Sequence, residues 1–340
     1  MAGCRSHRGE SLSDESQAER AAFGTDVSEI RHEPQTSRLR LRAYVICVGL
    51  FPFALVAITL FAFTTGFYAR HSGSPYLQQV GYARTLHDSG CQVVIEGDST
   101  AMVSIEPAII EQRTGLKACN IAEIAGVQRV NGMVSLDTYL AQNQRPKYLL
   151  FLYAPNNLVP PAKWTDVASF EGYYYQLRFL PLASRLKQFT HDPDSVIQTA
   201  ELGFRLAVQA LFRPAEKGDP MADRVAAQGR VPWIGPALTS CANFPATGRI
   251  PDPRWVQNLR QTYNRDGTHV FVDATPMPSC DPALAFYAPY LTKPLVDDGQ
   301  RTLPITAYSS TGNLHVNDTG AQMLSTLIAD QIARAERGEP

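Results

Sequence analysis

Apolar and polar positions follow three different patterns along this chain of 340 residues. Residues 1–42 are polar and lack any helical or strand period, which predicts a disordered tail. Between Ala43 and Tyr68 no side chain is charged. That stretch is longer than the roughly 20 residues that a helix needs to cross a bilayer. It starts too far into the chain for a cleaved signal peptide and predicts a retained signal anchor over residues 43–68.

Basic residues are unevenly placed around the predicted anchor. Four arginines lie on its N-terminal side, within residues 31–42, and Arg70 is the near basic residue on the other side. Positive charge stays on the cytoplasmic side of a membrane. The expected topology is a single-pass protein with a cytoplasmic N-terminus and residues 69–340 outside the cytoplasm, in the periplasm if the source is a bacterium.

From residue 92 onward, short apolar runs alternate with helical patterns. We expect strands at 92–96, 117–122, 147–153 and 269–273, and helices at 107–113, 127–142, 255–264 and 319–337. Strands that alternate with helices pair in parallel through right-handed crossovers. The sequence therefore predicts an α/β fold, a three-layer sandwich with a mostly parallel sheet, within one domain over residues 69–340.

A segment of about ninety residues interrupts this alternation. Residues 158–250 contain an aromatic run at Tyr173–Tyr175, an amphipathic helical pattern at 194–212 and a stretch rich in proline and glycine at 213–253. We interpret the segment as a helical and loop insertion. Two roles stay open: a lid or wall for a substrate, or a packing extension of the core. The tyrosines likewise suit either stacking on sugar rings or the core.

Composition and charge limit the classes of partner and cofactor that we expect. The net charge of −1 gives no reason to expect a nucleic-acid partner. The sequence has no zinc-type spacing of cysteine and histidine and no glycine-rich phosphate loop, so it implies no metal and no cofactor.

Four of the six cysteines fall in the exported part: Cys91, Cys119, Cys241 and Cys280. An even number outside the cytoplasm indicates disulfides. Four cysteines allow three pairings. We favour Cys91 with Cys119, because both begin neighbouring predicted strands, which leaves Cys241 with Cys280. Four unpaired buried thiols are the alternative.

Polar residues with catalytic chemistry stand where the predicted strands end. Gly97-Asp98-Ser99-Thr100 follows the first strand, Asn120 leads to Gly126 after the second, and Ala154-Pro155-Asn156-Asn157 follows the third. His315 precedes the last helix. Ligands bind at the carboxyl edge of open α/β sheets. A serine hydroxyl needs a neighbouring base, and imidazole titrates near neutrality. Ser99 and His315 are therefore the expected catalytic pair.

These four blocks together resemble the SGNH (GDSL-type) hydrolases, in particular membrane-anchored relatives linked to envelope polysaccharides. The resemblance covers residues 91–156 and, less fully, 313–328. It implies an oxyanion hole formed by the Ser99 N–H, the Gly126 N–H and the Asn156 side chain. It also implies that Asp98 is structural.

The sequence departs from that family at two places. Ala154 stands where the family has a glycine. The aspartate that usually precedes the histidine is missing, because Gly312 and Asn313 occupy the two candidate positions. Asn313 can orient an imidazole but cannot stabilise its positive charge. A Ser99–His315 dyad, a backbone carbonyl, or a remote acid such as Asp273 are the remaining solutions.

The resemblance implies a membrane-anchored serine esterase or O-acyltransferase that acts on acyl esters, with acetyl the expected group, of a cell-envelope carbohydrate. The expected partners are this acylated carbohydrate or another small acyl ester, and the lipid bilayer at residues 43–68. The missing carboxylate keeps an alternative open: a non-catalytic scaffold or glycan-binding subunit that works with other envelope-assembly proteins.

Overall fold

The computed structural model describes residues 35–74, 76–160, 170–191, 194–241, 248–309 and 314–339. The chain divides into two units, Met1–Leu55 and Val56–Pro340. Helix α1 (Gln35–Thr64) begins in the first unit and ends in the second. In the described part of the chain, no helix combines the length and the apolarity that crossing a membrane requires. Most of the predicted tail lies outside the described residues.

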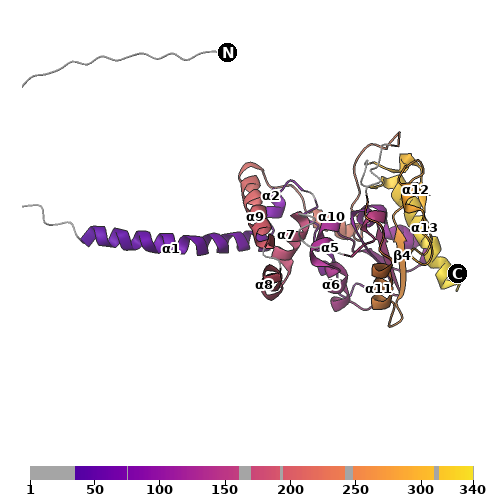
Figure 1. The fold of residues 1–340 in the computed structure, drawn as a ribbon, viewed down its shortest axis with the longest axis horizontal. Helices are drawn as coiled ribbons and strands as arrows, with labels where there is room; N and C mark the ends of the chain where they lie inside the picture. Colours follow the sequence, from indigo (N-terminus) through magenta and orange to yellow (C-terminus); the bar gives the residue numbers. More distant parts are fainter. Residues whose placement is uncertain are drawn as a thin grey trace, which may run out of the picture. The chain divides into compact units, whose positions relative to one another are not determined.

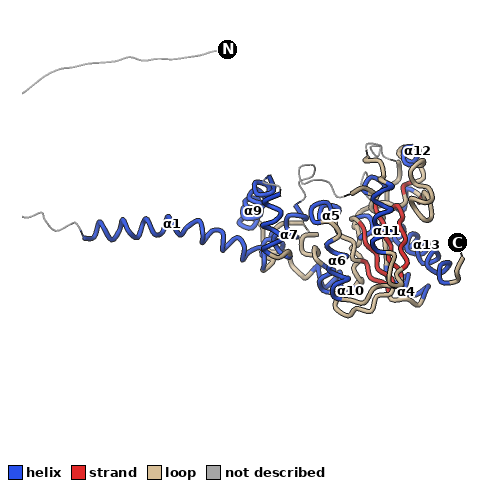
Figure 2. Tube along the Cα trace, turned by 60° about the horizontal axis from the view of Figure 1, so that its bottom comes forward, coloured by secondary structure: helices blue, strands red, loops and turns tan. Residues whose placement is uncertain are grey.

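Four parallel strands form the central sheet, in the order β2-β1-β3-β4, and Figure 2 shows them side by side in red. They are β1 (Val93–Gly97), β2 (Ala118–Asn120), β3 (Tyr148–Tyr153) and β4 (His269–Ala274). Each lies within two residues of its predicted position. The nearly continuous burial of β1 and β3 fits a sheet that is covered on both faces. The predicted α/β fold with a parallel sheet is confirmed.

Helices cover both faces of the sheet. One face packs against α3 (Ser99–Ser104), α4 (Pro107–Thr114) and α13 (Asp318–Glu336), and the other against α6 (Val134–Gln142) and α11 (Pro253–Tyr263). Alternate strand residues serve the two faces: Val93, Ile95, Leu150 and Leu152 point to the first, and Val94, Leu149, Phe151 and Tyr153 to the second. The result is a three-layer core.

Two helices differ from the sequence prediction for local reasons. The stretch predicted as one helix at 127–142 is two, α5 (Ala125–Asn131) and α6, separated at Gly132, which has a φ of 70°. A positive φ is readily adopted by glycine, so the chain can change direction there between the two helices. The last helix, predicted from residue 319, begins one residue earlier, and its N-cap is Asn317, whose side chain accepts from the Gly320 N–H at 3.1 Å.

The described residues of the insertion contain the helices α7 (Phe170–Phe179), α8 (Leu182–His191), α9 (Asp194–Phe212) and α10 (Pro220–Ala226). In Figure 1 the first three gather with α2 (Phe67–His71). Tyr173, Tyr174 and Tyr175 are at most 2% exposed and pack in a cluster with Phe63 and Leu202. The tyrosine run is therefore core, and its alternative role in stacking on sugars does not fit this burial.

Shorter elements complete the fold and connect the layers. They are η1 (Tyr82–Thr85), η2 (Pro155–Asn157), α12 (Leu284–Tyr287), η4 (Ile305–Ala307) and a small parallel pair formed by β5 (Met277–Pro278) and β6 (Thr302–Leu303).

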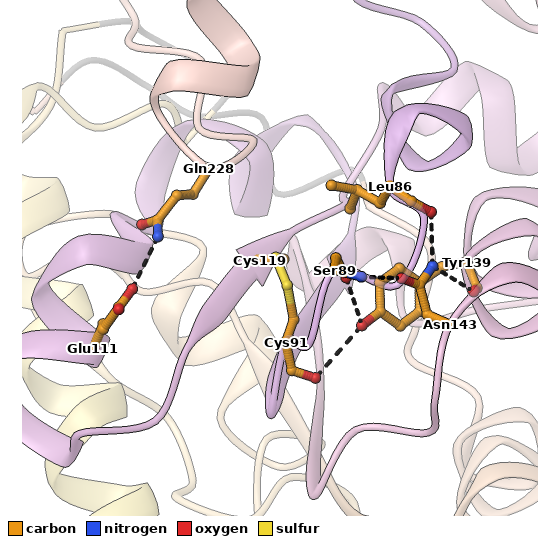
Figure 3. The surroundings of a disulfide bond; sticks show 8 residues. All are labelled: Leu86, Ser89, Cys91, Glu111, Cys119, Tyr139, Asn143 and Gln228. Atoms are coloured by element: carbon orange, nitrogen blue, oxygen red, sulfur yellow. Dashed lines mark hydrogen bonds between the residues drawn. A yellow bond between two sulfur atoms is a disulfide. The ribbon is translucent and has the colours of Figure 1, made fainter.

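Two disulfides are present, and both expected pairings are confirmed. Cys91 pairs with Cys119 and joins the segment before β1 to β2, while Cys241 pairs with Cys280 and joins the end of the insertion to the segment after β5. Figure 3 shows the first bridge beside hydrogen bonds from Tyr139 to Cys91 and from Asn143 to Leu86. These contacts hold α6 against the start of the sheet.

Candidate active site

The nucleophile candidate lies at a tight junction between β1 and α3. A Cβ added at Gly97 would lie 1.9 Å from the Leu152 carbonyl oxygen and 2.7 Å from Ala101 Cβ, so a side chain has no room there. Asp98 is the N-cap of α3, since its carboxylate accepts from the Thr100 N–H at 2.8 Å. Ser99 is thus the first residue of α3, at the carboxyl edge of the sheet.

Asp98 connects the ends of neighbouring strands. Its second carboxylate oxygen accepts from the Ala154 N–H at 3.0 Å and from Asn157 Nδ2 at 2.5 Å, both after β3. Thr100, which also donates to Asp98, lies 2.5 Å (Oγ1 to Oγ1) from Thr275 after β4. Asp98 therefore fixes the loops around Ser99, and its hydrogen bonds are those of a structural residue.

His315 reaches Ser99 across the edge of the sheet. Its Nε2 lies 3.1 Å from Ser99 Oγ. The loop that carries the ring is fixed on both sides: Tyr308 forms an antiparallel bridge with Val316, and the Ser309 N–H donates to the His315 carbonyl at 3.2 Å. Immediately afterwards the Asn317 cap begins α13. The 3.1 Å between His315 Nε2 and Ser99 Oγ is a hydrogen-bond distance, as a nucleophile and its base require.

The electrostatics of the ring suit a base. His315 is 6% exposed, and burial lowers the pKa of its imidazole to about 4 in spite of the opposing effect of the Asp98 charge. The ring is therefore neutral near pH 7 and able to accept a proton.

The other nitrogen of the ring, Nδ1, is not bonded to any acid in the part of the chain that the structure describes. Nδ1 is buried and has no hydrogen-bond partner among the described residues. Asp273 makes no hydrogen bond to it, and the Asp273 carboxylate instead accepts from the Asp298 N–H at 3.1 Å and from Gln331 Nε2 at 3.0 Å. Asn313 lies outside the described residues.

A cavity of about 160 Å³ opens beside the pair. Its lining contains Ser99 and His315 together with Tyr76, Met102, Val103, Ile124, Glu171 and Trp233. Most of these side chains are apolar or aromatic. A cavity of about 150 Å³ holds a benzene-sized molecule, so this one has room for an acyl group of a few carbons.

Of the three predicted oxyanion donors, Ser99 belongs to the described lining of the cavity, and Gly126 and Asn156 do not. Gly126 is the second residue of α5 and is buried, and first-turn N–H groups make no hydrogen bond within their own helix. Asn156 lies in η2, where its Cβ is close to Gly248. Neither belongs to the described lining of the cavity, whereas Ile124, two residues before Gly126, does. Their role at an oxyanion stays a prediction.

Sequence reasoning missed the aromatic wall of the cavity. The Trp233 ring lies against His315, with 4.3 Å between ring centroids, and Tyr76 stacks on Trp233 at 6.0 Å with 7° between the planes. Glu171, the second residue of α7, completes the rim. The sequence did hold a signal for this wall, because Trp233 is an isolated large aromatic residue inside the loop-rich stretch 213–253. The insertion therefore lines the cavity as well as packing in the core, and its role as a wall for a substrate stays a prediction.

A buried ion pair was also missed. Arg224 of α10 lies 3.3 Å (Nη1 to Oε2) from Glu123, and both side chains are almost fully buried. The guanidinium also lies 4.8 Å from the centre of the Tyr82 ring and donates to the carbonyls of Gln79 and Gly229. Burial raises the pKa of the Glu123 carboxyl above its usual value, and the nearby Arg224 offsets only part of that rise. This cluster joins the insertion to the segment after β2.

Comparison with known proteins found no matching family model, no matching curated protein and no matching solved structure.

Proposed function

We propose that this protein is an SGNH-like serine ester hydrolase or O-acyltransferase, with Ser99 as nucleophile and His315 as base. The observation that carries the proposal is the 3.1 Å separation of Ser99 Oγ and His315 Nε2 beside a small cavity. A neutral, buried imidazole at this distance is what a serine needs to become nucleophilic.

In the proposed reaction, Ser99 Oγ attacks the carbonyl carbon of an acyl ester while its proton passes to His315 Nε2. The negative charge develops on the carbonyl oxygen, and backbone and amide donors stabilise it. We assign that task to the N–H groups of Ser99 and Gly126 and to Asn156. His315 returns the proton to the departing alkoxide, which leaves an acyl-serine. Water then releases the acid, or a sugar hydroxyl accepts the acyl group.

The size and lining of the cavity favour a short acyl chain such as acetyl. The acyl acceptor or donor that we propose is a cell-envelope carbohydrate, as the resemblance of the sequence blocks implies. The uncharged stretch between Ala43 and Tyr68 and the arginines before it support an anchor in the bilayer, with residues 69–340 outside the cytoplasm. The two disulfides fit an oxidising compartment.

The first test is turnover of an acetyl-ester chromogenic substrate by the full chain in detergent. We expect Ser99→Ala and His315→Ala to abolish it, and Ser240→Ala, on an exposed loop, to leave it intact. Turnover that survives in Ser99→Ala refutes the mechanism.

A second candidate function is a non-catalytic scaffold or glycan-binding subunit. The observation that favours it is the His315 Nδ1 atom, which has no acid beside it among the described residues. Labelling with a serine-directed fluorophosphonate separates the two candidates. Labelling at Ser99 supports the enzyme, and its absence together with retained glycan binding supports the scaffold.

A further inference from the structure

The acid of a serine–histidine triad performs two tasks. It fixes the orientation of the imidazole, and it stabilises the imidazolium that forms when the serine loses its proton. Here the His315 Nδ1 atom is buried without a partner among the described residues, and Asp273 is held by Gln331 and Asp298. Among the described residues, neither task is therefore performed by an acid bonded to the ring.

Trp233 is in the position to perform them. The centroids of its ring and of the His315 ring are 4.3 Å apart, with 37° between the planes. The Tyr76 ring stacks on Trp233, with 6.0 Å between the ring centroids and nearly parallel planes. The three rings form a series in which Tyr76 restrains Trp233 and Trp233 restrains His315.

The backbone before Trp233 is bound to the helix of the nucleophile. The Val231 N–H donates to the Met102 carbonyl at 3.1 Å, and Arg230 Nε donates to the Val103 carbonyl at 3.2 Å. Met102 and Val103 belong to α3, which begins at Ser99. A further contact to α4, from Gln228 Nε2 to Glu111 at 2.9 Å, is visible in Figure 3.

The same segment is bound to the loop of the base. The Leu238 N–H donates to the Tyr308 carbonyl at 2.8 Å, and Tyr308 pairs with Val316, next to His315. Arg230 Nη2 also donates to Asp318 at the start of α13. Residues 228–238 thus bridge the elements that carry Ser99 and His315, and Trp233 lies in the middle of this bridge.

We propose that Trp233 is a positioning residue that replaces the triad acid: its ring orients His315 by packing and its π face stabilises the imidazolium. This inference rests on the proposed function. A cation within about 6 Å of an aromatic centroid is attracted by the ring quadrupole, and tryptophan gives the strongest effect. Because His315 is buried, little water screens that attraction.

The test is site-specific replacement of Trp233 in the full chain by tryptophans with one to four ring fluorines. Fluorine weakens the quadrupole with little change of size. We expect kcat for the acetyl ester to fall stepwise, by roughly ten-fold over the series, with KM nearly unchanged. The same series at Trp255, which packs against Tyr153 on the other face of the sheet, is the matched control and should change nothing.

The second readout does not need activity. The pKa of His315, followed by NMR titration, should decrease with each fluorine at position 233, because the cation loses stabilisation. Trp233→Phe should retain part of the effect and Trp233→Leu should lose it.

Constant kcat and constant pKa across the fluorinated series overturn the inference, since a role in packing alone does not depend on the quadrupole. If the wild-type protein neither turns over esters nor labels at Ser99, the proposed function fails. A decrease in the pKa of His315 in that protein still supports the interaction with Trp233, and a constant pKa still overturns it.

Discussion

His315 Nε2 lies 3.1 Å from Ser99 Oγ although the two residues are 216 positions apart in the chain. Each is placed by a cap: Asp98 begins the helix of Ser99, and Asn317 begins the helix that follows His315. The pairing therefore depends on two helix starts at one edge of a parallel sheet, which is where ligands bind in open α/β folds.

The activity should persist well into the acid range. Because burial lowers the pKa of His315 to about 4, the base is still neutral at mildly acidic pH. We expect kcat/KM to stay flat from neutral pH down to about 5 and to fall about ten-fold per pH unit below about 4. The measurement is a pH–rate profile, with circular dichroism at each pH to confirm that the protein is folded. An acid limb near 6.5 would contradict the buried position of His315.

The same residue should make folding sensitive to acid. The pKa of His315 is near 6.5 when unfolded and about 4 when folded, so the unfolded state binds more protons between these values. Its contribution is complete above about pH 6.5, and roughly 3 kcal/mol is lost as pH falls to about 4. Urea unfolding of wild type and His315→Asn at several pH values tests this. Burial raises the pKa of Asp297 to about 6, which acts on stability in the opposite direction. Subtracting the unfolding free energies of the variant from those of the wild type at each pH removes such contributions, because both proteins share them.

A side chain at Gly97 should be incompatible with the site. In Gly97→Ala the new Cβ would meet the Leu152 carbonyl at 1.9 Å, so β1 must move away from β3. We expect a loss of about 1–3 kcal/mol in unfolding free energy and a large loss of turnover. Gly203→Ala is the control. Gly203 lies within helix α9, and a Cβ added there would meet no atom closer than 3.9 Å, from Thr59. That variant should keep both stability and activity, and an active, stable Gly97→Ala would contradict the geometry.

Local sequence patterns were sufficient to predict the sheet. All four strands lie where short apolar runs predict them, because a strand buried on both faces must be apolar along its length. The helix at 107–114 was also clear, since it begins at Pro107 and ends before Gly115, whose φ is 71°. Ser99 and His315 could be selected because motifs at strand ends depend on local sequence.

Long-range contacts explain what sequence patterns missed. Trp233 and Arg224 lie in loop-rich sequence, and their importance comes from partners more than eighty positions away, His315 and Glu123. A long-range contact also involves the start of the last helix: Asn317 is the cap, whereas the side chain of Asp318 forms an ion pair with Arg230. Capping propensity alone ranks asparagine and aspartate about equally.

The Cys241–Cys280 disulfide should stabilise the connection between the insertion and the core. It closes a loop of 39 positions, slightly longer than the 28 of Cys91–Cys119. Replacing both cysteines by serine should cost about 3–4 kcal/mol, since a longer closed loop restricts the unfolded chain more. Urea unfolding with and without reductant measures it. Cys47→Ser, at an exposed free thiol, should have no effect, and an unchanged midpoint for the double variant would refute the stabilising role.

The buried pair of Arg224 and Glu123 provides the last prediction. Arg224→Met leaves the Glu123 carboxylate buried without its cation, and removal of one partner of such a pair typically costs about 3–5 kcal/mol. Adding Glu123→Gln should recover part of this loss, because a neutral amide no longer needs the arginine. Arg113→Met is the matched control: it breaks an ion pair with Asp330 whose side chains are each 46% exposed, and it should cost about 1 kcal/mol or less. Equilibrium unfolding of the three variants and the double variant gives the coupling energy directly. If Arg224→Met and Arg113→Met cost the same, the buried pair does not stabilise the connection between the insertion and the segment after β2.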